Sequence, residues 1–350
     1  MMELRVLTMR ITMVGVWLVA FAAWLYAPLL FQRWQRTQSL NILIWPTMLD
    51  AKKLAEFEHN TGIKLYISYY ESNDELVRKL RVTKGAQYDL VIAADTAVHA
   101  LIQEKLVQPI DTNKLSFYSD VRPWLLHHYF DPNNRYSVPY YMSMYGLGID
   151  RRYFKELPSA SWALLFENNG YRITMTDDPR RALLIAANYL FGSFDDLDNP
   201  ERIADIKHLL LQQKKWVELY SDIRGEEVLA AQSCPVALTI SSDLTRVQRE
   251  YPTLQFLIPQ EGTFMTIDSC IIPVATSKQE LVYQLLNVIY QPDMIRYHAD
   301  KYGFCPPLKS VAPAEHIICP DEQQLKQIDF FRNVVPKDVI DKLWVAVMAH

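Results

Sequence analysis

Asp268 is a carboxylate in an unusual sequence environment. It stands in an otherwise apolar stretch, TFMTIDSCIIP, which predicts a buried strand. A carboxylate in such a strand must accept hydrogen bonds or face a cation, because an unpaired buried charge is very costly. That cation is either a structural arginine or part of a bound ligand.

Asp178 and Trp45 also stand where a side chain can bind a ligand. Asp178 directly precedes Pro179, an ideal first helical residue, so it caps a helix, and a capping residue can also face a binding site. Trp45 ends the apolar run 40–45, which Pro46 stops. Ligands of open α/β sheets bind at the carboxyl ends of the strands, which favours a binding role for Trp45 over core packing alone.

Motifs of catalysis are missing from the sequence. It contains no GxSxG, HExxH, GxxxxGK[ST] or GxGxxG, and the His127–His128 pair has no metal-ligand spacing around it. The cysteines have no CxxC spacing, which disfavours a zinc site. A net charge of −4 without long charged runs argues against nucleic acid as a partner. We therefore expect a binding protein without a metal or cofactor rather than an enzyme.

An uncharged apolar run from Ile11 to Phe31 predicts a membrane-spanning signal segment within residues 1–38. It is either a cleaved signal sequence or an uncleaved anchor. The small-residue pair Ala20-x-Ala22 lies inside the apolar run, which favours the anchor. The rest of the chain then faces the periplasm, tethered to the inner membrane.

Four cysteines can form two disulfides in such an oxidising compartment. The pairings considered are Cys305 with Cys319 and Cys234 with Cys270. Buried free thiols are the alternative for each pair.

Strand and helix patterns alternate after residue 39. Apolar runs at 65–70 and 88–94 predict further strands, and helices are predicted from the Ser72–Glu75 capping box and around 97–105. A second such region includes a strand at 171–175, a helix at 179–191 and a strand at 236–240. The order predicts parallel βαβ units, and the roughly 310 residues suit two α/β lobes.

Short segments spread along the chain resemble the spermidine/putrescine-binding proteins of bacterial polyamine ABC transporters, within the type II periplasmic binding protein superfamily. Their order and spacing carry the resemblance. The segments are FEHNTGIK (57–64), YESN (70–73), YDLV (88–91), FDPNNRYSVP (130–139), SWA (161–163), TDD (176–178), DSCIIP (268–273) and GFCP (303–306).

The resemblance implies two lobes that close about a ligand by hinge bending. The first is expected to contain residues 39–142 plus 268–312, and the second residues 143–267 plus 313–350. Carboxylates for ammonium groups and aromatic faces for methylenes are what a polyamine site needs. The resemblance places Trp45, Asp178 and Asp268 in that site. The predicted ligand-binding set also includes Thr47, Tyr141, Arg181, Thr266 and Phe304.

Arg181 is the most consequential departure from the family pattern, which has a polyamine-binding glutamate there. A positive charge at that place would repel an ammonium group. The aromatic box is also reduced, because Thr266 replaces a tryptophan and Phe304 a tyrosine, although Tyr141 and Tyr145 can rebuild part of it. We therefore hypothesise a ligand that combines an amine with an anionic group; the alternative is that Arg181 points into solvent.

These features predict a solute-binding protein that delivers a polyamine or a related cationic or zwitterionic amine to ABC permease subunits. We expect it to be monomeric and held at the membrane by its N-terminal helix. The alternative is a membrane-anchored sensor or adaptor that reuses the binding-protein fold with an eroded polyamine site.

Overall fold

The computed structural model describes residues 13, 15–17, 19–21, 23–27, 38–194, 196–221 and 224–349. The membrane segment predicted for residues 11–31 lies partly outside these residues, and its described part, between 13 and 27, is helical. No helix among the described residues has both the length and the apolar character needed to cross a bilayer.

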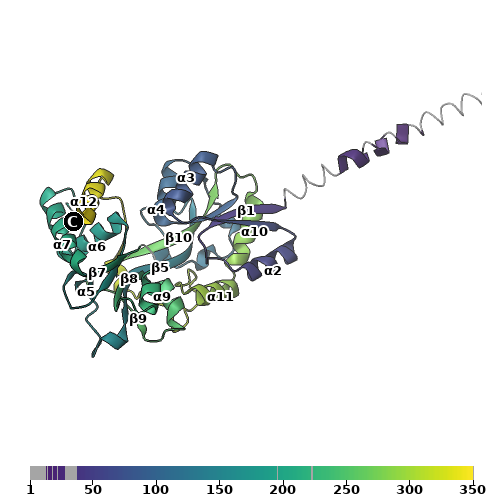
Figure 1. Ribbon diagram of the computed structural model, residues 1–350. Coiled ribbons are helices and arrows are strands. Elements are labelled where there is room, and N and C mark those ends of the chain that lie inside the picture. The colour runs from purple at the N-terminus through teal and green to yellow at the C-terminus, as the bar shows by residue number, and fades with distance from the viewer. Residues whose placement is uncertain are drawn as a thin grey trace, which may run out of the picture.

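Two α/β lobes are joined by two long antiparallel strands that run through both (Figure 1). These crossing strands are β5 (Ser137–Asp150) and β10 (Thr263–Pro273). The strand order is β2-β1-β3-β10-β5-β8-β6-β7, with β4 and β11 paired to β10 and β9 paired to β5. The remaining strands are β1 (Ser39–Ile44), β2 (Lys64–Tyr69), β3 (Leu90–Ala94), β4 (Val107–Gln108), β6 (Ile173–Met175), β7 (Val217–Tyr220), β8 (Val236–Ile240), β9 (Leu254–Leu257) and β11 (Ile328–Phe330).

Helices cover the sheet of each lobe (Figure 1). Those of the first lobe are α2 (Ala51–Thr61), α3 (Asn73–Thr83), α4 (Asp95–Gln103), α10 (Gln279–Ile289) and α11 (Pro292–Tyr302). Those of the second lobe are α5 (Ala163–Phe166), α6 (Pro179–Phe191), α7 (Pro200–Gln213), α8 (Gly225–Ala230), α9 (Ser241–Gln248) and α12 (Lys337–Ala349). The predicted lobe boundaries at 142/143 and 267/268 fall within β5 and β10, and they remain a prediction.

Local sequence signals explain where several helices begin and end. Asp50 caps α2 by accepting a hydrogen bond from the Lys53 amide, and Gly62 ends the helix in the left-handed region at φ 73°. Ser72 caps α3 in the same way. The helix predicted around 97–105 instead begins at Asp95, directly at the end of β3, where an acidic first turn suits the helix dipole.

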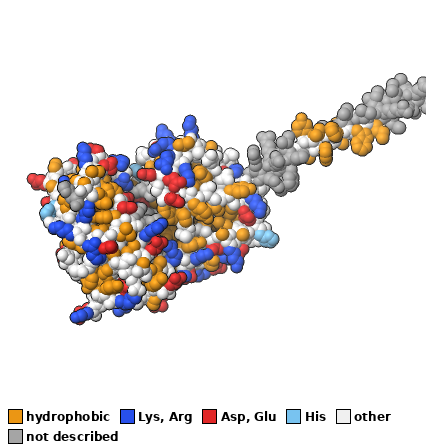
Figure 2. All heavy atoms as spheres, in the orientation of Figure 1, with side chains coloured by type: hydrophobic (Ala, Val, Ile, Leu, Met, Phe, Trp, Pro, Cys, Tyr) orange, Lys and Arg blue, Asp and Glu red, His pale blue; other side chains and the backbone are white. Residues whose placement is uncertain are grey.

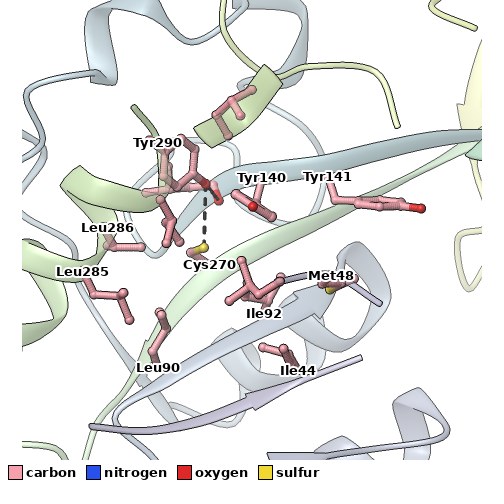
Figure 3. Close-up of a cluster of buried hydrophobic side chains, with 14 of the residues drawn as sticks. Ile44, Met48, Leu90, Ile92, Tyr140, Tyr141, Cys270, Leu285, Leu286 and Tyr290 are labelled. Carbon is pink, nitrogen blue, oxygen red and sulfur yellow. Dashed lines mark hydrogen bonds between the residues drawn. The ribbon is translucent and has the colours of Figure 1, made fainter. Parts of the chain in front are cut away.

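Each lobe has a cluster of buried hydrophobic residues of its own, and a third cluster joins the two lobes along β5 and β10. The two free cysteines lie in different lobes. Cys270 of β10 lies in the first-lobe core, where it accepts a hydrogen bond from Tyr290 at 3.7 Å (Figure 3). Cys234 precedes β8 in the second lobe, and both thiols are buried and free. The predicted 234–270 pairing is therefore wrong. Cys305 and Cys319 do form a disulfide, with their Cα atoms 5.2 Å apart.

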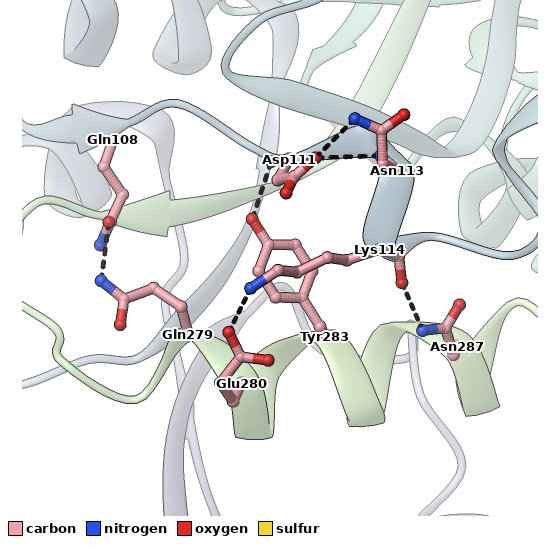
Figure 4. Close-up of polar contacts among 8 residues, drawn as sticks. All are labelled: Gln108, Asp111, Asn113, Lys114, Gln279, Glu280, Tyr283 and Asn287. Carbon is pink, nitrogen blue, oxygen red and sulfur yellow. Dashed lines mark hydrogen bonds and ion pairs between the residues drawn. The ribbon is translucent and has the colours of Figure 1, made fainter.

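Polar contacts fasten α10 to the segment 108–114 (Figure 4). The Tyr283 hydroxyl accepts a hydrogen bond from the Asp111 amide at 2.8 Å, and Asn287 donates one to the Lys114 carbonyl at 2.8 Å.

On the visible face of the molecule, acidic and basic side chains are interspersed (Figure 2).

Candidate functional site

Asp268 lies where the two lobes meet. In the sheet register it stands opposite Ala94, the last residue of β3, and opposite Tyr141 of β5. Its residue surface is only 8% exposed, and no described residue donates a hydrogen bond or forms an ion pair to its carboxylate. Burial, with a smaller contribution from the charge of Asp95, raises the pKa of Asp268 to about 8. The sequence predicts a buried carboxylate here, and the structure places it at the junction of the two lobes with no cation from the described residues beside it.

Asp95 is the second buried carboxylate at this junction. It accepts hydrogen bonds from the Tyr129 hydroxyl at 2.6 Å and the Thr266 hydroxyl at 3.1 Å. Burial raises its pKa to about 6, although these hydrogen bonds oppose the shift. Sequence reasoning placed Thr266 in the site but missed Asp95. The signal available was an acidic residue directly after a predicted strand, at the edge where ligands bind.

Asp178 is the N-cap of α6, as predicted. Its Oδ1 atom accepts hydrogen bonds from the backbone amides of Arg180 at 2.8 Å and Arg181 at 3.1 Å. Its Oδ2 atom lies 3.8 Å from Nε of Arg181. The carboxylate is thus already engaged by its own helix.

Arg181 does not point into solvent, since its side chain is only 15% exposed. The guanidinium carbon lies 5.1 Å from the ring centroid of Tyr145 and 5.8 Å from that of Phe331. Burial lowers the pKa of Arg181, but the charges of Tyr145 and Asp178 outweigh that effect, so the pKa is raised overall. The guanidinium is therefore a fixed positive charge inside the molecule.

The Tyr145 hydroxyl connects these groups. Its pKa is raised chiefly by burial, lowered by Arg181, and raised by the carboxylates of Asp178, Asp95 and Asp268. Contacts also bring these residues together: the Arg181 guanidinium lies 5.1 Å from the Tyr145 ring, its Nε lies 3.8 Å from Asp178, and Thr266, two residues before Asp268 on β10, donates a hydrogen bond to Asp95. We call these five residues, Asp95, Tyr145, Asp178, Arg181 and Asp268, the interlobe site.

Trp45 approaches the interlobe site through Tyr70. The two rings meet edge to face with centroids 5.3 Å apart, and the Tyr70 hydroxyl donates to the carbonyl of Ile92 at 3.0 Å. Burial raises the pKa of Tyr70, and the charge of Asp268 adds to the rise. Thr47, by contrast, is exposed in a left-handed turn at φ 66°.

Tyr141 and Phe304 form an aromatic wall beside Asp268. Their ring centroids are 4.5 Å apart, and Phe304 is completely buried. Burial raises the pKa of Tyr141, as do the charges of Asp243 and Asp268. The binding roles of Tyr141, Phe304, Trp45 and Thr47 remain predictions.

A further acidic pair lies beyond Tyr141. Arg246 is 3.0 Å from Asp243 and 3.9 Å from Glu226. Burial and the charge of Asp243 raise the pKa of Glu226 to about 7. Because this pair has an arginine of its own, it differs from Asp268.

The remaining described features supply no competing site. Among the described residues, no group of three or more histidine, cysteine and acidic side chains is placed to hold a metal ion. A cavity of about 530 Å³ lies along α11 and residues 306–317, and no member of the interlobe site lines it.

Comparisons with known proteins agree with this architecture. The spermidine/putrescine-binding periplasmic protein of Salmonella typhimurium is 29% identical over 265 residues, covering 75% of this chain and 76% of that protein. The Escherichia coli protein of the same name is 27% identical over 299 residues, covering 83% and 85%. These relatives confirm the resemblance noted in the sequence.

Solved structures show the same two-lobed fold. The spermidine/putrescine ABC transporter substrate-binding protein PotD of Streptococcus pneumoniae superimposes with a TM-score of 0.79 at 21% identity, covering 89% of this chain and 98% of that one. A lipoprotein of Treponema pallidum superimposes with a TM-score of 0.76 at 20% identity, covering 88% and 99%.

Residues 52–322 match the family described as bacterial extracellular solute-binding protein. That range spans most of the chain and includes every residue of the interlobe site. The proteins of this family bind solutes rather than catalyse reactions, in agreement with the absence of catalytic motifs in the sequence. This chain belongs to the bacterial extracellular solute-binding protein family.

Proposed function

We propose that this protein binds a cationic amine at the interlobe site, outside the cytoplasm, and delivers it to the permease of an ABC transporter. The observation that carries the proposal is the Asp268 carboxylate, which is buried and has no partner among the described residues. An ammonium group would supply both the charge and the hydrogen-bond donors that this carboxylate lacks.

The aromatic side chains around Asp268 suit the rest of such a ligand. Tyr141 and Tyr145 offer ring faces and edges on which methylene groups can pack, and Trp45 is linked to the same place through Tyr70. A cation near an aromatic face gains ~0.5–2 kcal/mol. The site therefore combines a charge for an ammonium with apolar surface for an alkyl chain.

Names of the relatives support the choice of an amine. The proteins from Salmonella typhimurium and Escherichia coli are named for spermidine and putrescine, and another relative from Pseudomonas aeruginosa is named for putrescine. Each of these proteins aligns with most of this chain. Attachment to a membrane through residues 11–31 and a monomeric state are further parts of the proposal.

Ligand binding would close the lobes about the two crossing strands. Asp95 is the first residue of α4, and Tyr145 and Asp268 belong to the crossing strands β5 and β10. Asp178 and Arg181, by contrast, are the N-cap and a first-turn residue of α6 in the second lobe. A ligand that touches both groups stabilises the closed arrangement, because only that arrangement satisfies all of its contacts.

The test is the melting temperature of the purified full chain against amines and a matched neutral compound. A ligand that binds only the folded state must raise the melting temperature as its concentration increases. We expect stabilisation by at least one of putrescine, spermidine and 4-aminobutanoate, and none by butane-1,4-diol. If none of these amines shifts the transition at millimolar concentration, the proposal is wrong.

A further inference from the structure

The carboxylates of the interlobe site are not equally available to a ligand. Asp178 accepts two backbone hydrogen bonds and lies beside Nε of Arg181. Asp95 accepts hydrogen bonds from two hydroxyl groups. Asp268 alone among these carboxylates accepts none from a described residue. The site therefore offers one open carboxylate for one ammonium group.

Arg181 brings a positive charge to the same place. The rings of Tyr145 and Phe331 flank its guanidinium, and its side chain is largely buried. Turning the side chain outward would sacrifice both ring contacts and the attraction to Asp178. The charge therefore stays in the site while a ligand binds.

Arg181 and Asp268 both lie along β5, because the Arg181 guanidinium is 5.1 Å from the ring of Tyr145 and Asp268 pairs with Tyr141 of the same strand. A ligand long enough to span these positions meets a carboxylate at one end and a guanidinium at the other. A second ammonium group would be repelled by the guanidinium, whereas a carboxylate would be attracted and can accept paired hydrogen bonds from it.

We propose that Arg181 determines the ligand class, so that the site accepts an amine that carries an anionic group rather than a diamine. The inference rests on the proposed function, because it concerns the same site. It assigns the ammonium to Asp268 and the anionic group to Arg181. At a few ångströms, replacing repulsion by attraction changes affinity by at least about tenfold, even with solvent screening.

Two compounds of equal length test the inference directly. Putrescine and 4-aminobutanoate both carry an ammonium group at one end of a four-carbon chain, and they differ in whether the other end is a second ammonium or a carboxylate. Titration calorimetry on the full chain should give at least about tenfold tighter binding of 4-aminobutanoate. Arg181→Glu should reverse the preference, and Arg181→Gln should remove most of it. Lys342→Glu makes the same charge change at a side chain that is 81% exposed on α12, and should leave the preference unaltered.

The possible results separate the inference from the proposed function. Tighter binding of putrescine than of 4-aminobutanoate by the unmodified chain overturns the inference and leaves amine binding in place. Equal affinity for 4-aminobutanoate in the unmodified chain and in the Arg181→Glu variant also overturns the inference and leaves amine binding in place. If neither compound nor spermidine binds to any folded variant, as judged by its melting transition, both are wrong.

Discussion

A buried aspartate lies at each end of β3, Asp89 just before the strand and Asp268 of β10 opposite its last residue, and the two have different surroundings. Asp89 immediately precedes the strand, where it accepts hydrogen bonds from the Asn41 amide at 2.8 Å and the Thr276 hydroxyl at 2.5 Å. The Lys278 ammonium also forms an ion pair with the Asp89 carboxylate at 3.0 Å. At the other end of the strand, Asp268 is equally buried but receives no such contact from a described residue.

This contrast distinguishes a structural charge from a binding charge. A buried carboxylate is tolerated when its own chain supplies a cation and hydrogen bonds, as at Asp89. Asp268 lacks both, so the unliganded protein relieves the cost by holding a proton, which is the meaning of its raised pKa of about 8. A bound ligand cation would give Asp268 the kind of partner that Lys278 gives Asp89.

The largest effect is expected from Asp268→Asn, which removes the charge and keeps the shape. Affinity for any amine that binds the unmodified chain should fall by about a hundredfold or more, because a neutral amide cannot pair with an ammonium. Titration calorimetry measures the loss. The folded state should survive, since the wild-type carboxyl is itself largely protonated near neutral pH.

The matched change is Asp89→Asn at the other end of the strand. We expect the free energy of unfolding to fall by about 2–4 kcal/mol, because Lys278 loses its partner in a partly buried place. Urea denaturation measures this, and amine affinity of the folded variant should stay within about twofold of the original. A comparable loss of amine affinity in the two variants would contradict the assignment of a structural role to Asp89 and a binding role to Asp268.

A pH series gives a further test of the same contrast. Because the pKa of Asp268 is raised from its ordinary value to about 8, the unliganded folded chain binds a proton that the unfolded chain has released. Stability contributed by this group should therefore fall as pH rises from about 4 to about 8, and level off above. Asp95, with a pKa of about 6, adds to the lower part of that window.

Amine binding should show the opposite trend, because the ligand ammonium displaces the proton. Affinity should rise with pH by up to about tenfold per unit between pH 6 and 8 and then level off, while the amine itself stays charged. Calorimetry in buffers of different ionisation enthalpy would detect the released proton. A flat profile with no proton release would mean that Asp268 is already ionised before the ligand arrives.

The fold could be predicted from the sequence because its signals are local. The apolar run before Trp45, the Asp50 cap and the Gly62 stop each act within a few residues, and α2 begins and ends where they indicate. The alternation of such units then specifies an α/β class. Family resemblance extends this to two lobes, which periodicity alone does not specify.

The site was predicted only in part because its contacts are long-range. Asp95 lies beside Asp268 only through the antiparallel register of β3 and β10, which no local pattern specifies. Arg181 packs against Phe331, which is distant in sequence, with the guanidinium 5.8 Å from the ring centroid. A residue type at one position cannot reveal which side chain a remote segment will place against it.

The smallest effect is expected from Tyr129→Phe, which probes the intermediate case of Asp95. This carboxylate is buried beside Asp268, yet its own chain provides two hydroxyl donors, of which Tyr129 is the closer at 2.6 Å. Removing that hydroxyl should cost about 1 kcal/mol of stability and raise the pKa of Asp95 further, because one donor to the charged form is lost. Amine affinity near neutral pH should fall by no more than about threefold, since Asp268 remains intact. Denaturation and calorimetry on one preparation would give both numbers.

If affinity instead falls as far as in Asp268→Asn, then Asp95 is the principal partner of the ammonium. In that case the binding charge at this end of β3 is Asp95, which has hydrogen-bond donors from its own chain, and not Asp268, which has none among the described residues.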